Sequence, residues 1–121
     1  MATPEEFPFE ATDGALVVRV NGPLTMQNTS ELRALALDQL ASQGPLRGLI
    51  VDLSACDYVD STAIGAFIVL KMRLRDAQRF RLCGATKMVD KIFQTTRFDQ
   101  VVSIDARLAD SLAALPADAQ A

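Results

Sequence analysis

The apolar run "GLIVDL", residues 48–53, places the tightest limit on how this chain can fold. It is too short for a packed helix, and its branched side chains are typical of a strand that is covered on both faces. Such strands belong to parallel sheets with helices packed on both sides. The run therefore predicts a central strand of an α/β domain.

Strand and helix patterns alternate around this run. Strands are expected at residues 15–22, 79–85 and 101–105, and helices at residues 28–44, 63–76, 87–98 and 107–115. The stretch "FEAT" should pair with residues 15–22 as a hairpin, since Asp13-Gly14 is a favoured two-residue turn. The alternation implies right-handed crossovers and a mixed, mostly parallel sheet of four to five strands with about four helices.

The first expected helix carries the clearest helical signals. Asn28, followed three places later by Glu31, resembles a capping box. After it, apolar residues recur at helical spacing until Gly44-Pro45, namely Leu32, Leu35, Ala36 and Leu40. An amphipathic helix is expected here.

Length and composition indicate one compact domain. The chain has 121 residues, of which 50% are hydrophobic and 22% charged. We expect a single domain over residues 1–121 with a core at about 7–115 and short flexible ends, roughly 1–6 and 116–121. The formal charge of -3 favours protein partners over nucleic acid or a membrane surface. Without a bilayer-length apolar run or a signal-peptide pattern, the chain is expected to be cytoplasmic.

Several chemistries lack their usual residues in this sequence. Zinc is not expected, because there is no histidine and Cys56 and Cys83 form no CxxC pair. Serine hydrolysis would need a base and a GxSxG motif, and a nucleotide site would need GxxxxGK[ST]. Neither motif is present, so no cofactor or metal is expected. An acidic magnesium pocket of Asp52, Asp57 and Asp60 stays open as an alternative to solvated loop acids.

The stretch "CDYVDSTAIG", residues 56–65, joins the central strand to the next helix. In α/β sheets functional groups gather beyond the carboxyl ends of strands, which is where this joint lies. If the helix begins at about Thr62, Ser61 is its N-cap, and helix capping alone would explain the serine. Capping and a functional role are both left open by the spacing.

The segment "VDLSACDYVDSTAIGAFIVL" resembles the signature of the STAS domain family, in particular the bacterial anti-sigma factor antagonists. The resemblance covers about residues 15–115 and includes "VNGPLT" and "GATKMVDKIFQTTRFDQVVSI". It implies that Ser61 is phosphorylated by a partner that is both an anti-sigma factor and a serine kinase of the histidine-kinase-like ATPase type. It further implies that a PP2C-type phosphatase removes the phosphate, that the unphosphorylated form binds the partner and frees the sigma factor, and that the protein is not an enzyme.

The same resemblance implies a set of partner-binding residues around the serine: Thr25, Asp57, Asp60, Ser61, Thr62, Ala63 and Gly65. Thr25 stands where the family commonly has an acid. Some relatives keep the fold as subunits of stressosome or lipid-transport assemblies, so a structural subunit without phosphorylation is the alternative. Gly65 lies inside an expected helix, where glycine costs about 1 kcal/mol relative to alanine. Close backbone packing at Gly65 is therefore expected.

Overall fold

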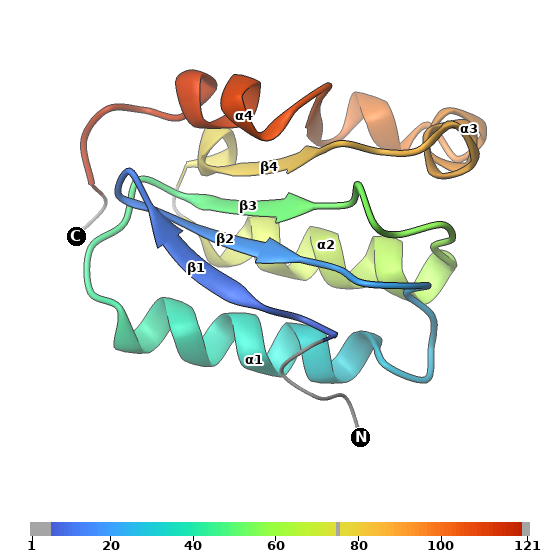
Figure 1. Ribbon diagram of the computed structural model, residues 1–121, viewed down its shortest axis with the longest axis horizontal. Coiled ribbons are helices and arrows are strands. Elements are labelled where there is room, and N and C mark those ends of the chain that lie inside the picture. The colour runs from blue at the N-terminus through green and yellow to red at the C-terminus, as the bar shows by residue number, and fades with distance from the viewer. Residues whose placement is uncertain (1–5, 75, 120–121) are drawn as a thin grey trace.

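The computed structural model describes residues 6–74 and 76–119, and the described chain forms an α/β fold (Figure 1). Its strands are β1 (Phe9–Thr12), β2 (Ala15–Arg19), β3 (Leu49–Asp52), β4 (Phe80–Cys83) and β5 (Ser103–Asp105). Its helices are α1 (Thr29–Ser42), α2 (Ser61–Arg73), α3 (Lys87–Thr95) and α4 (Leu108–Ala114), with short 3-10 turns at Ala77–Arg79 and Phe98–Gln100. The predicted fold class is confirmed.

The five strands form one sheet in the order β1-β2-β3-β4-β5. The β1–β2 pair is antiparallel, and every other neighbouring pair is parallel. Strand β3 lies in the centre and is buried along its whole length, as its apolar sequence predicts. The expected hairpin is also present, with Thr12 opposite Ala15. Asp13 and Gly14 both have positive φ, which a tight two-residue turn between twisted strands requires.

Helices cover both faces of the sheet unequally. In Figure 1, α1 and α2 lie on one side and α4 on the other. The larger core contains alternate strand residues such as Val18, Val51 and Leu82, together with Phe67 of α2 and Phe93 of α3. The smaller core on the opposite face is closed by α4 and Leu115. Because successive strand residues point to opposite faces, β3 contributes to both cores.

Helix α1 differs from its expected pattern in two details. Leu35 is 37% exposed, while Leu37 is half-buried and packs against the core in its place. Asn28 is the N-cap residue, but its side chain makes no capping hydrogen bond. Its Oδ1 atom instead accepts a hydrogen bond from the backbone N–H of Thr25 at 2.9 Å, so it stabilises the turn before the helix.

Hydrogen bonds hold the C-terminal segment as far as residue 118, where a flexible end is expected. Arg47 donates hydrogen bonds to the carbonyl oxygens of Leu112, Leu115 and Pro116, which neutralises the C-terminal end of α4. Buried Arg79 donates to the carbonyl oxygen of Asp118 at 2.7 Å. Residues 116–118 therefore differ from the flexible end that the sequence predicts. The predicted flexible ends also include residues 1–5, 120 and 121, which lie outside the described residues. They further include Ala119 and Glu6, and the carbonyl of Glu6 accepts a hydrogen bond from the N–H of Asn21.

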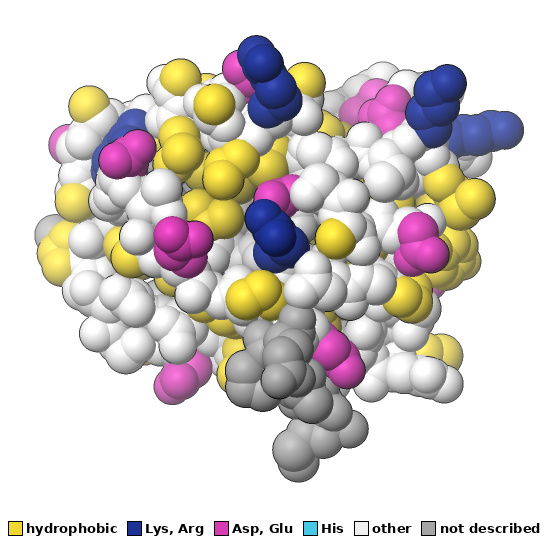
Figure 2. Space-filling model, in the orientation of Figure 1, with side chains coloured by type: hydrophobic (Ala, Val, Ile, Leu, Met, Phe, Trp, Pro, Cys, Tyr) yellow, Lys and Arg dark blue, Asp and Glu magenta, His cyan; other side chains and the backbone are white. Residues whose placement is uncertain are grey.

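Surface charge is mixed rather than concentrated. On the face shown in Figure 2, acidic and basic side chains of the described residues are interspersed, with no large patch of one sign. In the part of the chain that the structure describes, no helix has the length and apolarity that a membrane span needs.

Candidate functional site

The loops that follow β2 and β3 lie side by side at the carboxyl end of the sheet. Leu24 and Val59 form an isolated parallel bridge between them. The N–H of Leu24 donates to the carbonyl of Tyr58 at 2.8 Å, and the N–H of Asp60 donates to the carbonyl of Leu24 at 3.2 Å. The joint between β3 and α2 is thus held against the chain that leads into α1.

Asp60 is the N-cap of α2 and links the two loops. Its Oδ1 atom accepts from the backbone N–H of Ala63 at 3.0 Å, and its Oδ2 atom accepts from the N–H of Met26 at 2.8 Å. The hypothesis that Ser61 caps this helix is therefore wrong. A carboxylate forms stronger hydrogen bonds than a hydroxyl and its charge suits the positive end of the helix dipole, so aspartate takes the position.

Ser61 is the first residue of α2 and is exposed to solvent. Its hydroxyl forms no hydrogen bond with any described residue. The first backbone N–H groups of a helix have no carbonyl partner within it, so Ser61 and Thr62 present unpaired donors beside this hydroxyl. The arrangement offers a free nucleophile to an external enzyme and a helix N-terminus that can accommodate a phosphate.

Thr25 holds the neighbouring turn. Its carbonyl oxygen accepts from the Thr29 hydroxyl at 2.6 Å, and its own hydroxyl accepts from the N–H of Gln27 at 3.2 Å. These bonds direct Met26 outward, where its side chain is 74% exposed. Thr25 directly precedes Met26, whose N–H is bonded to Asp60.

The structure separates the other predicted partner-binding residues into two groups. Asp57, Thr62 and Gly65 are exposed at or near the start of α2. Ala63 is fully buried in the larger core, so its side chain cannot reach a partner and the prediction fails for this residue. Its complete burial in the larger core leaves room for a small side chain only, while its N–H serves the Asp60 cap.

Gly65 does not serve the role expected of it within the chain. A Cβ atom built at this position meets no atom within 4 Å, and the backbone conformation is an ordinary helical one. No packing among the described residues therefore needs a glycine here. The position is a gap on the exposed face of α2.

The three loop acids do not form a metal pocket. The Oδ1 atom of Asp52 accepts from the N–H of Ser54, and its Oδ2 atom lies 3.8 Å from Nε of Arg19. Asp60 is occupied by two backbone N–H groups, as described above. Within residues 6–74 and 76–119, no three potential metal-ligating side chains come together. The acidic magnesium pocket is not supported.

Both cysteines are buried, as expected of small apolar residues. Burial raises the pKa of the Cys56 thiol, which donates to the carbonyl of Tyr58 at 3.3 Å. Burial, reinforced by the charges of Asp52 and Asp105, raises the pKa of Cys83 to about 12. Both thiols are therefore protonated and poorly reactive near neutral pH.

Exposed apolar side chains at this end of the sheet were not predicted. Met26, Tyr58 and Met88 are 74%, 44% and 60% exposed. Met88 belongs to α3, which starts against the joint because the Thr86 hydroxyl donates to the carbonyl of Cys56 at 3.5 Å. Methionine side chains adapt to different partner surfaces, so these residues extend the candidate site. Exposure of an apolar residue cannot be read from sequence spacing.

Comparison with known proteins gives a consistent assignment. The family model of the STAS domain matches residues 6–113. A Thermotoga maritima protein described as a candidate anti-sigma factor antagonist superposes with a TM-score of 0.80 at 18% identity, covering 90% of this chain and 93% of its own. An anti-sigma factor antagonist from Mycobacterium paratuberculosis gives 0.79 at 21% identity, with 95% and 98% covered.

The phosphorylated form of SpoIIAA, a Bacillus cell fate determinant, has a TM-score of 0.64 at 21% identity, with 88% and 96% covered. At these identities the solved structures establish a shared fold. The family match spans nearly all of the sequence, from β1 to α4. The chain therefore belongs to the STAS domain family.

Proposed function

We propose that this protein is an anti-sigma factor antagonist whose binding to its partner is switched off by phosphorylation of Ser61. The partner is an anti-sigma factor that is also a serine kinase of the histidine-kinase-like ATPase type, and a PP2C-type phosphatase reverses the modification in the cytoplasm. The observation that carries the proposal is the exposed, unbonded hydroxyl of Ser61 at the first position of α2, with Asp60 taking the capping role. Since Ser61 has no capping function, its hydroxyl is free for regulation.

The proposed docking surface extends from Ser61 along α2. Ser61, Gly65, Ile68 and Met72 recur at helical spacing, and each is exposed. Ile68 and Met72 give this stripe an apolar character, with 36% and 77% of their side chains exposed. The gap at Gly65 lets another chain approach the helix backbone closely. A partner that covers this stripe would lie directly over the Ser61 hydroxyl.

Phosphorylation would oppose such a complex through charge. A phosphoserine carries about -1.5 to -2 charges near neutral pH, and it would sit next to the Asp60 carboxylate. Between Arg47 and Lys71 the chain has no basic residue that could neutralise it. A like charge on the partner about 5 Å away costs roughly 3 kcal/mol at an effective dielectric of 20, which weakens binding about a hundredfold.

The fold itself should survive the modification. The unpaired N–H groups at the start of α2 and the helix dipole both stabilise an added phosphate. Loss of binding is therefore expected to arise at the interface and not through unfolding. A large rearrangement of the phosphorylated protein would contradict this mechanism.

Mass spectrometry after incubation with the cognate kinase and ATP tests the proposal. We expect one acid-stable phosphate on the Ser61 peptide, none on Ser61→Ala, and normal modification of the control Ser42→Ala, which changes an exposed serine at the C-terminal end of α1. Ser61→Ala should bind the kinase constitutively, whereas Ser61→Asp should bind about a hundredfold more weakly. Equal affinity of these two variants for the kinase would remove Ser61 from the mechanism.

A second candidate function is a structural subunit of a larger assembly. It is favoured by Thr25, which uses its hydroxyl and carbonyl to build a turn where the family commonly has an acid. In this case partner binding would be the same for Ser61→Ala and Ser61→Asp, and no phosphate would be found. The experiment above therefore separates the two functions.

A further inference from the structure

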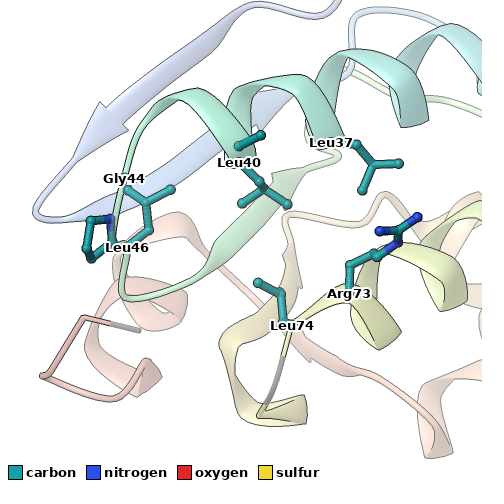
Figure 3. Close-up of a pocket in the computed structure, with 8 residues that line it drawn as sticks. Leu37, Leu40, Gly44, Leu46, Arg73 and Leu74 are labelled. Carbon is teal, nitrogen blue, oxygen red and sulfur yellow. The ribbon is translucent and has the colours of Figure 1, made fainter. Parts of the chain in front are cut away.

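A cavity of about 410 Å³ lies at the other end of α2, where α1 and α2 both terminate. Gly44 reverses the chain after α1 with a φ of +80°, and Leu74 leaves α2 in an extended conformation. These two exits leave a hollow between the helix ends (Figure 3). Its labelled lining residues are Leu37, Leu40, Gly44, Leu46, Arg73 and Leu74.

The side chains that line the cavity are mostly apolar, and Arg73 and backbone groups make the rest of its surface polar. Leu37, Leu40, Leu46 and Leu74 are each half-buried, with one part packed against the larger core and the rest open to the cavity. Together they present a hydrocarbon surface to a molecule that enters. Its volume falls within the usual range for sites that bind small molecules.

Among the described residues that line the cavity, Arg73 carries the only charge. Its side chain extends from α2 toward Leu37 of α1 (Figure 3). The guanidinium has no hydrogen bond or ion pair with any described residue, whereas Arg47, Arg79 and Arg81 are bonded to carbonyls or carboxylates. A planar guanidinium is well matched to a carboxylate, which it binds through two parallel hydrogen bonds.

We propose that this cavity binds a medium-chain monocarboxylate, with its hydrocarbon chain against the four leucines and its carboxylate on Arg73. A single cation beside four leucine side chains fits one negative charge attached to an apolar body. A phosphate or a multiply charged acid would find too few donors among the described lining residues. Arg73 lies about 18 Å along α2 from Ser61, so ligand binding at the cavity and phosphorylation of Ser61 can be measured separately.

Titration of the isotope-labelled protein with octanoate, followed by backbone amide NMR, tests the proposal. We expect saturable shifts at Leu40, Leu46 and Leu74 below the concentration at which octanoate forms micelles. Hexanoate should bind about 2- to 15-fold more weakly, since each buried methylene contributes up to about fourfold in affinity. Octanol, which has the same chain without the charge, should bind at least about tenfold more weakly than octanoate.

Two variants locate the site and one serves as a control. Arg73→Gln should remove the preference for octanoate over octanol, whereas Arg33→Gln on the exposed surface of α1 should leave it unchanged. Ala41→Phe fills the cavity from an exposed position and should abolish binding of both compounds without unfolding the domain. The proposal is overturned if octanoate and octanol bind equally to the wild type, if the shifts map elsewhere, or if Arg73→Gln binds octanoate normally.

Discussion

Gly65→Ala should make the isolated protein more stable and its complex with the partner weaker. Gly65 lies in the second turn of α2, and a Cβ added there meets no atom within 4 Å. Alanine favours a helix by about 0.8 to 1.0 kcal/mol relative to glycine, partly because it restricts the unfolded chain. Since the position is open, no steric clash offsets this gain within the domain.

The expected change is large enough to measure. For a chain of 121 residues the entropy of unfolding is about 0.25 kcal/mol/K, so a gain of 1 kcal/mol raises Tm by about 4 °C. A methyl group forced against a docked chain costs about 1 to 3 kcal/mol, which corresponds to a loss in affinity of about 5- to 150-fold. The two effects have opposite signs, so a general loss of structure cannot produce both.

Urea unfolding and calorimetric titration with the kinase partner measure the two quantities on the same sample. Gly48→Ala is the matched control, because a Cβ there would lie 2.3 Å from the carbonyl oxygen of Arg79. That variant should lose stability, although it introduces the same methyl group. If Gly65→Ala gains stability but binds the partner within twofold of the wild type, the α2 face is not the docking surface. A loss of stability would mean that atoms close to Gly65 leave no room for a methyl group.

Further predictions concern the Asp60 cap of α2 and the ion pair between Arg81 and Asp105. Asp60→Ala removes the hydrogen bonds to the N–H groups of Ala63 and Met26, and it should lower the free energy of unfolding by about 0.5 to 2 kcal/mol in urea titrations. Asp60→Asn, which keeps an acceptor, should lose less; equal losses would mean that the cap contributes through charge alone. The Asp105 carboxylate accepts from Arg81 at 2.7 and 3.0 Å, and these bonds, with a further one from Ser111, hold its pKa below the ordinary 3.8. A lowered pKa stabilises the fold above the unfolded-state value, so the stability advantage of wild type over Asp105→Asn should be full near neutral pH and shrink as pH falls below about 4. An advantage that is constant from neutral pH down to about pH 2 would contradict the assignment.

Much of the fold follows from local sequence patterns. The run at residues 48–53 is apolar except for Asp52, so it predicts a central, doubly covered strand, and β3 is that strand. Asp13-Gly14 likewise predicts its hairpin, because few other residue pairs accept two positive φ angles. Element ends were less predictable. Helix α2 ends at Arg73 and not near Asp76, since the Asp76 side chain caps the following 3-10 turn.

Candidate residues were predictable as a group, but their individual roles were not. The motif places Asp60 and Ser61 beyond the end of β3, and the structure agrees. Which of the two caps the helix depends on where α2 begins, a difference of one residue that local spacing leaves open. Ala63 and Gly65 are both small residues in the motif, yet Ala63 is buried and Gly65 faces solvent. Their roles differ because the first two turns of α2 rotate them onto different sides of the helix.

The sequence alone determined the order of strands and helices and the position of the serine after the central strand, because hydrophobic periodicity and turn residues act over a few neighbouring positions. Tertiary structure decided which polar groups are hydrogen-bonded within the domain and which are exposed to solvent. It placed the backbone of Met26 on Asp60, left the Ser61 hydroxyl exposed, and opened the cavity at Arg73 between two helix ends that are about thirty residues apart in the chain. Exposure and hydrogen bonding depend on residues brought together by folding, and no local pattern contains that information.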